Sequence, residues 1–271
     1  MFPEPAAWSP SPASFILSPG EVHVWRACLV PDGEVLDRLE VVLAPQERLR
    51  ANQFAFAKDR DKFIAGRAIL RQLLGAYLGR PPGELILESG PYGKPVLRTK
   101  APDWWIRFNL SHAHNVALYA FARGRELGVD LERIQPDFPG HEVAEHFFSA
   151  GELSELRGLP AEMRAQGFFT CWTSKEAYLK ACGYGLTMPL NSFDTSSVPG
   201  LSKELRSADH RKWKLYPFEP APGFVAAIVV EGVDWRVRHF DLAAPFPASL
   251  VCVAAAGQAT RPSVESAGAN V

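Results

Sequence analysis

The segment Gly167–Gly183, GFFTCWTSKEAYLKACG, restricts the fold most, because it predicts a long amphipathic helix with a carboxylate on its apolar face. Positions 169, 172, 176 and 179 recur with the period of one helical stripe. Three of them are apolar, and the fourth is Glu176. An ionised carboxylate in an apolar stripe is costly unless a cation or a ligand neutralises it. Gly183 is the kind of residue that ends a helix in the left-handed conformation.

Two interpretations of Glu176 are open from this segment alone. The carboxylate either reaches solvent or pairs with Lys180, one turn later, as an ordinary structural ion pair. Alternatively, it belongs to a site that holds a cation, and Lys175 and Lys180 on the neighbouring helix faces bind an anion close by. The remaining sequence motifs favour the second interpretation.

Composition narrows the class of protein. The chain has 271 residues, enough for one large domain or two smaller ones, and its net charge of −1 argues against bulk affinity for nucleic acid or an anionic membrane. No apolar run approaches a membrane span, and no secretory signal is evident. The four cysteines lack metal-site spacing and suit reduced thiols in a cytoplasmic protein; they are Cys28, Cys171, Cys182 and Cys252.

A second carboxylate motif lies in Glu126–Ile134, ELGVDLERI, which predicts a strand. Asp130 and Glu132 stand two residues apart and therefore share one face of that strand. Two adjacent carboxylates repel each other, so the pair is either solvated or bridged by a cation. Mg²⁺ commonly takes one or two carboxylates together with phosphate and water. Glu176 would complete such a site if its helix packs across this strand.

Basic and polar residues that suit phosphate binding occur earlier in the chain. Arg67 and Arg71 lie one turn apart on a helical stretch from about Pro45 to Leu78, where they form either a solvated face or a phosphate site. Lys94 lies in a loop with Gly93 and Pro95 that is either a plain turn or a ligand-binding backbone. His112 lies beside Asn109 and Ser111 at the end of a predicted strand, where a histidine is usually only a loop residue.

Five short motifs in this order resemble those of the Sfp-type 4′-phosphopantetheinyl transferases. They are Gly66–Arg71 (GRAILR), Gly93–Pro95 (GKP), Asn109–His112 (NLSH), Gly128–Glu132 (GVDLE) and Trp172–Lys180 (WTSKEAYLK). The resemblance covers about residues 21–240. One position departs from it, because the basic residue that some members carry about three positions before Arg50 is here Glu47.

The resemblance implies an α+β fold with two pseudo-symmetric halves, each a small antiparallel sheet packed on a long helix, and an active site in the cleft between them. We expect a Pro-rich, poorly ordered arm at residues 1–20, the two halves at residues 21–125 and 126–243, and a flexible tail at residues 244–271. Strands are expected at Glu21–Val30, Trp104–Ser111, Asn115–Phe121, Trp213–Phe218 and Phe224–Val230, with Trp235–Leu242 as a further edge strand.

The resemblance also implies the reaction: transfer of 4′-phosphopantetheine from coenzyme A to a serine of an apo acyl or peptidyl carrier protein, by a monomeric enzyme. Asp130, Glu132 and Glu176 would bind Mg²⁺. Glu176 and Lys180 would be catalytic, and either Glu176 or a water molecule would take the serine proton. The residues expected to bind coenzyme A are Arg50, Arg67, Arg71, Gly93, Lys94, Pro95, Asn109, Ser111, His112, Lys175 and Lys180.

Two other functions fit parts of the pattern. A metal-dependent pyrophosphatase that hydrolyses coenzyme A would release phosphopantetheine without a carrier. A non-catalytic carrier-binding protein would keep the fold and would lack one of the three acids, whereas this sequence retains all of them.

Overall fold

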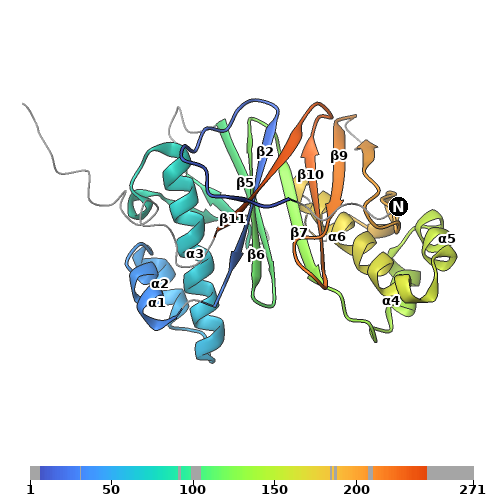
Figure 1. Ribbon diagram of the computed structural model, residues 1–271, viewed down its shortest axis with the longest axis horizontal. Helices are drawn as coiled ribbons and strands as arrows, with labels where there is room; N and C mark the ends of the chain where they lie inside the picture. Colours follow the sequence, from blue (N-terminus) through green and yellow to red (C-terminus); the bar gives the residue numbers. More distant parts are fainter. Residues whose placement is uncertain are drawn as a thin grey trace, which may run out of the picture.

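A computed structural model describes residues 7–30, 32–90, 93–98, 105–183, 185, 188–206 and 210–242. Two sheets pack face to face, and a long helix covers the outer face of each. The layers therefore run from α3 (Ala57–Leu78) through the first and second sheets to α6 (Arg164–Cys182), as Figure 1 shows. This arrangement confirms the α+β fold with two similar halves.

The first sheet has the strand order β1-β11-β2-β6-β5. Its strands are β1 (Ser9–Pro10), β11 (Arg236–Leu242), β2 (Glu21–Cys28), β6 (Val116–Arg123) and β5 (Ile106–Ala113). Strand β2 is buried on both faces, because Trp25 packs towards α3 whereas Val22 and Val24 pack towards the second sheet. Its sequence, EVHVWRAC, alternates apolar and polar residues, a pattern that is typical of a strand with only one buried face.

The second sheet is antiparallel, with the order β7-β10-β9-β8. Its strands are β7 (Leu127–Arg133), β10 (Phe224–Glu231), β9 (Lys212–Phe218) and β8 (Lys203–Arg206). Leu127, Val129 and Leu131 of β7 face the first sheet in a shared apolar core. Since side chains alternate along a strand, Asp130 and Glu132 take the opposite face, on the side of α6.

Glycines and capping residues fix the helix boundaries. The predicted helical stretch divides into α2 (Pro45–Ala51) and α3, and α3 ends at Gly79 with φ of 62°. Helix α6 ends at Gly183 with φ of 74°, as the sequence predicted. Ser149 and Glu152 form the capping box of α5. The remaining elements are α1 (Gly33–Glu40), α4 (Gly140–Phe147), α5 (Ala150–Gly158), β3 (Leu87–Ser89), β4 (Pro95–Leu97) and short 3₁₀ turns at Pro82–Glu84, Ala161–Met163 and Leu190–Ser192.

The last strand and the N-terminal segment of the described chain are placed differently from what the sequence predicts. Strand β11 lies inside the first sheet, parallel to β2, so this sheet is mixed and draws a strand from the range assigned to the second half. Residues 7–20 are also packed rather than loose: Leu17 is only 2% exposed, and the Phe15 and Trp25 rings stack with centroids 5.3 Å apart. These apolar side chains anchor a proline-rich segment. The predicted tail at residues 244–271 lies outside the described residues.

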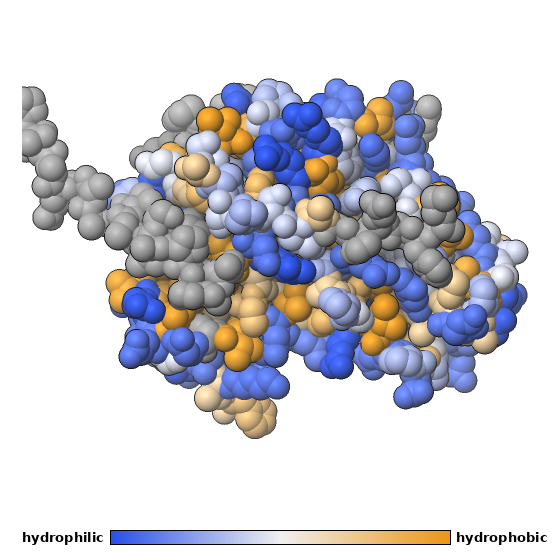
Figure 2. Space-filling model, viewed as in Figure 1, coloured by the Kyte–Doolittle hydropathy of each residue, from blue (hydrophilic) through white to orange (hydrophobic). Residues whose placement is uncertain are grey.

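Hydrophilic and hydrophobic residues are interspersed over the face drawn in Figure 2. None of the described helices is long and apolar enough to span a membrane. Among the described residues, Cys28, Cys171 and Cys182 form no disulfide, and Cys252 lies outside the described residues.

Candidate active site

A cavity of about 490 Å³ lies where the two halves meet, between α6 and strands β4 and β5. The residues that line it are Gly93, Lys94, Pro95, Asn109, Leu110, Ser111, His112, Glu176, Leu179, Lys180, Gly183 and Gly185. Motifs that are far apart in the sequence therefore meet around one space.

A second cavity of about 320 Å³ adjoins the first and extends to α3. The two share Gly93, Pro95, Leu110 and His112 in their walls. The further lining residues of the second cavity are Leu29, Phe54, Asp59, Lys62, Phe63, Gly66, Arg67, Leu70, Ala117 and Tyr119. Together the cavities extend from Glu176 and Lys180 on α6 to Lys62 and Arg67 on α3.

Gly128 lets α6 lie directly on β7. A Cβ atom at this position would come within 2.1 Å of the Ala177 carbonyl oxygen and 2.4 Å of the Ala181 backbone nitrogen. Only a residue without a side chain fits such a close approach. The glycine of the GVDLE motif therefore brings the helix that carries Glu176 and Lys180 against the strand that carries Asp130.

Asp130 is the most enclosed of the acids, at 5% exposure. Its Oδ1 accepts hydrogen bonds from Lys180 Nζ at 2.6 Å and from Ser111 Oγ at 2.9 Å. Its Oδ2 is buried and has no hydrogen-bond partner in the described part of the chain. Asn109 secures the adjacent backbone, since its Oδ1 accepts from the Val129 N–H at 2.8 Å and so joins the edge strands β5 and β7.

Burial and neighbouring carboxylates disfavour the ionised forms of Glu132 and Glu176. Burial and the neighbouring charges of Asp130 and Glu176 raise the pKa of Glu132 to about 7, although Lys180 opposes the shift. Burial and the charge of Asp130 likewise raise the pKa of Glu176, again against Lys180. A bound cation stabilises the ionised forms of such a cluster, because its positive charge offsets the repulsion between the carboxylates.

The acids fit a divalent cation by their chemistry. Within the part of the chain that the structure describes, no group of three or more histidine, cysteine, aspartate or glutamate side chains is arranged to hold a metal ion. The unpartnered Oδ2 of Asp130 is nevertheless a buried acceptor beside two further carboxylates, and carboxylate oxygens are the donors that Mg²⁺ prefers.

Most of the residues predicted to bind coenzyme A lie at the two cavities. Lys94 Nζ donates to the Lys180 carbonyl oxygen at 2.9 Å, next to the end of α6. Burial, followed by the charge of Lys180, lowers the pKa of His112, and Lys62 adds to this effect. Arg67 is 3.4 Å from a carboxylate oxygen of Glu47. Arg50 is exposed, with its guanidinium carbon 5.7 Å from the centre of the Phe63 ring.

Two predicted phosphate ligands are wrong because their side chains are buried and fully engaged elsewhere. Arg71 is 1% exposed; its Nε donates to Glu47 at 2.6 Å, and it also donates to the carbonyl oxygens of Pro82 and Leu85. Glu47, where the family pattern has a basic residue, thus turns Arg71 away from the cleft.

The side chain of Lys175 is 0% exposed and is 2.8 Å from the Glu152 carboxylate. Its ammonium also donates to the backbone carbonyl oxygens of Leu190 and Phe193. Lys175 therefore ties α6 to α5 and to the segment that follows α6, and it does not face the cavity.

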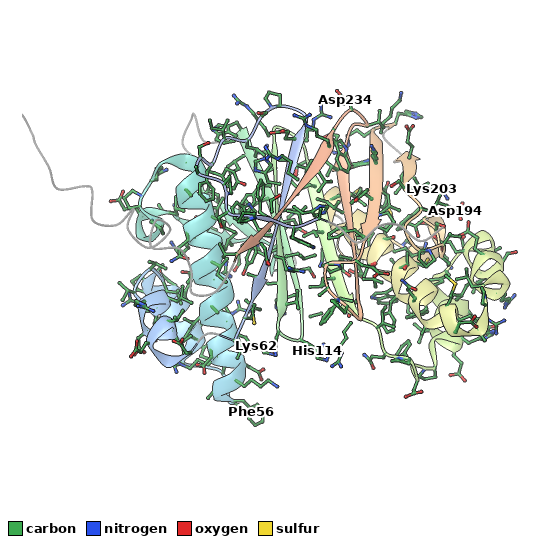
Figure 3. All side chains as sticks on the ribbon, in the orientation of Figure 1. Phe56, Lys62, His114, Asp194, Lys203 and Asp234 are labelled. Carbon is green, nitrogen blue, oxygen red and sulfur yellow. The ribbon has the colours of Figure 1, made fainter. Side chains whose placement is uncertain are left out.

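Lys62 is a cation of the cleft that the sequence analysis missed. It lines the smaller cavity, and Figure 3 places it and His114 along the same edge of the molecule. No ion pair involving Lys62 is present among the described residues. The available signal was its position, five residues before Arg67, but α3 carries many charges, and only the fold separates those that face the cleft.

Comparisons with known sequences identify the family of this chain. A profile described as "4'-phosphopantetheinyl transferase superfamily" matches residues 126–229, and one described as "4'-phosphopantetheinyl transferase, N-terminal" matches residues 30–123. The chain is 38% identical over 233 residues to the 4'-phosphopantetheinyl transferase HetI of Nostoc sp., which covers 86% of this chain and 97% of that protein. It is 31% identical over 190 residues to psf-1 of Bacillus pumilus, covering 69% and 78% of the two chains.

A third relative is Sfp of Bacillus subtilis, which is 25% identical over 200 residues, covering 73% of this chain and 87% of Sfp. The two profile matches cover both halves of the fold, and the three carboxylates, Lys94, His112 and Lys180 lie on the motifs that suggested the resemblance. The chain belongs to the 4′-phosphopantetheinyl transferase superfamily.

Proposed function

We propose that this protein transfers the 4′-phosphopantetheine group of coenzyme A to a serine of an apo acyl or peptidyl carrier protein, with Mg²⁺ as cofactor. The observation that carries the proposal is the pair of adjoining cavities, in which Glu176 and Lys180 line one space and Lys62 and Arg67 line the other, with His112 in the walls of both. A substrate with a pyrophosphate group and a separate 3′-phosphate matches two adjoining spaces that each carry cationic side chains.

The pyrophosphate belongs in the larger cavity, beside Glu176, Lys180 and Ser111. The 3′-phosphate belongs in the smaller cavity, where Lys62, Arg67 and His112 supply cations or hydrogen-bond donors. Asp130, Glu132 and Glu176 would hold Mg²⁺. Bound there, Mg²⁺ supplies positive charge that neutralises the phosphate oxygens.

The reaction forms one bond and breaks one. The serine oxygen attacks the β-phosphorus, the bond from that phosphorus to the bridging oxygen breaks, and adenosine 3′,5′-bisphosphate leaves. Glu176, whose pKa is raised by burial, accepts the serine proton directly or through a water molecule. Lys180 lies beside the developing charge, and holding the reacting groups in place supplies much of the remaining rate.

The direct test is incubation of the protein with coenzyme A, Mg²⁺ and a panel of purified apo carrier proteins, followed by intact mass measurement. The expected result is a carrier heavier by one phosphopantetheine group, together with free adenosine 3′,5′-bisphosphate. Release of phosphopantetheine without a carrier would instead indicate a pyrophosphatase, and carrier binding without any mass change would indicate a non-catalytic protein. A monomeric state and a cytoplasmic location complete the proposal.

Replacing His112 with alanine is expected to narrow the preference of the enzyme for coenzyme A over 3′-dephospho-coenzyme A. One charge-assisted contact is worth roughly 1.5–3 kcal/mol, so the ratio of kcat/KM values should fall by about one to two orders of magnitude. Lys62→Met should act in the same direction. The exposed Lys58, on the same helix, provides the matched control as Lys58→Met. An unchanged preference in both cavity variants would remove the 3′-phosphate from the smaller cavity.

Docking of the carrier is expected to use apolar contact around Phe147, which packs against Trp172 of α6, the helix that carries Glu176. Phe147 is 42% exposed and packs edge-on against Trp172, whereas Phe148 is 3% exposed and belongs to the core. Phe147→Ala should raise the KM for the carrier and leave the KM for coenzyme A unchanged. Phe56→Ala, an exposed phenylalanine at the start of α3 (Figure 3), is the control.

A salt series separates apolar docking from docking by charge. Apolar contact tolerates salt, whereas steering by exposed residues such as Arg133 weakens as ionic strength rises. A carrier KM that climbs steeply with salt, with the slope lost in Arg133→Ala, would contradict the apolar assignment.

A further inference from the structure

The ammonium group of Lys180 is held by β5 and β7 rather than by its own helix. It donates to Asp130 Oδ1 at 2.6 Å, to Ser111 Oγ at 3.2 Å and to the Val129 carbonyl oxygen at 3.3 Å. An ammonium has three N–H donors, so these contacts use all of them. Lys180 is therefore the counter-charge of Asp130, even though Glu176 lies one turn away on α6.

All three carboxylates of this site interact with Lys180. Of the described residues, Lys180 is the one that forms an ion pair with any of the three acids, and its partner is Asp130. Its charge also opposes the upward pKa shifts of Glu132 and Glu176. The Lys180 side chain remains 30% exposed, whereas that of Asp130 is 7% exposed, so the lysine is the partner with access to the cavity.

We propose that Lys180 competes with the divalent cation for Asp130, so that metal binds tightly only when a phosphate-bearing substrate draws Lys180 away from this carboxylate. The reason is electrostatic: a lysine ammonium and a divalent cation both gain from Asp130, and they repel each other when both lie beside it. An anionic pyrophosphate in the same cavity attracts the ammonium and removes that conflict.

A positive coupling between metal and substrate follows. If coenzyme A raises the affinity for metal, the metal must raise the affinity for coenzyme A by the same factor. Lys180 therefore acts before any bond is made: it lowers the affinity for metal as long as no substrate is bound. This inference rests on the proposed function for the identity of the phosphates, whereas the ion pair itself is a feature of the structure.

The test measures metal affinity directly, with Mn²⁺ as the probe, by electron paramagnetic resonance and by calorimetry. In the absence of coenzyme A, Lys180→Met should bind Mn²⁺ about tenfold or more tightly than the wild type, because one positive charge beside the site has been removed. Coenzyme A should raise Mn²⁺ affinity strongly in the wild type and much less in Lys180→Met. Lys180→Arg keeps the charge and should resemble the wild type.

Two further variants separate charge from local structure. Ser111→Ala removes the neutral donor to the same carboxylate oxygen, and Lys94→Met removes a nearby cation that donates to backbone carbonyl oxygens. Neither should reproduce the gain in Mn²⁺ affinity. Equal Mn²⁺ affinities for wild type and Lys180→Met, with both proteins folded by circular dichroism, would overturn this inference alone. Failure of every form to bind Mn²⁺, with or without coenzyme A, would overturn the metal site of the proposed function as well.

Discussion

Replacing Asp130 with asparagine is expected to lower the rate of phosphopantetheine transfer by roughly 10³-fold, the scale on which enzymes lose rate with one preorganised electrostatic group. Asparagine has nearly the shape of aspartate, and its oxygen can still accept from Lys180 and Ser111. What it lacks is the charge that the proposed Mg²⁺ requires. The measurement is transfer to an apo carrier by intact mass, across a series of Mg²⁺ concentrations.

Asparagine is a better replacement than alanine because Asp130 is part of a buried ion pair. Carboxylate repulsion alone suggests that its removal would not destabilise the protein, but the structure shows that alanine would leave Lys180 without its partner. Asp137→Asn, at an exposed position shortly after β7, is the matched control and should retain full activity. Transfer by Asp130→Asn at a rate near that of the wild type would mean that the acids do not form the metal site.

Replacing Gly128 with alanine is expected to lower the free energy of unfolding by about 3 kcal/mol, at the upper end for an overpacked core. The added methyl group would meet backbone atoms of α6 at Ala177 and Ala181, and backbone atoms cannot rotate out of the way as a side chain does. The helix must therefore move off β7, and it carries Glu176 and Lys180 with it. Denaturant unfolding measures the loss of stability.

The activity of folded Gly128→Ala tests the link between packing and the site. A displacement of about 1 Å at reacting groups costs roughly 10²-fold in rate, so transfer should fall even at temperatures where the protein remains folded. Gly158→Ala is the control, since no atom lies within 4 Å of a Cβ at that position. If Gly128→Ala were as stable and active as Gly158→Ala, the close contact between α6 and β7 would not be needed.

The elements that carry the acids were predictable from the sequence because their signals are local. A period of two placed Asp130 and Glu132 on one face of β7, and a helical period placed Glu176 on α6. Gly183 marked the end of α6 through its own backbone chemistry. These features depend on neighbours a few residues away, so they do not require knowledge of the fold.

The groups that the cationic side chains contact lie on segments far away in the sequence. Arg67 and Arg71 look alike on one helix, yet Arg71 is buried against Glu47 and two carbonyl oxygens, whereas Arg67 lines a cavity. Lys175 and Lys180 are five residues apart on α6, and they form ion pairs with carboxylates from different elements, Glu152 and Asp130. Helical spacing gives the face of a long side chain, but not the group that the side chain meets.

The sequence by itself therefore determined the chemical inventory: a pair of carboxylates on a strand, a third on a helix, and glycine loops and cations around them. Tertiary structure alone decided that β11 joins the first sheet, that Lys180 neutralises Asp130, and that Lys62 faces the cleft. The physical reason is the range of the interactions. Backbone periodicity and capping act within a few residues, whereas sheet pairing, burial and ion pairing depend on which segments the folded chain brings into contact.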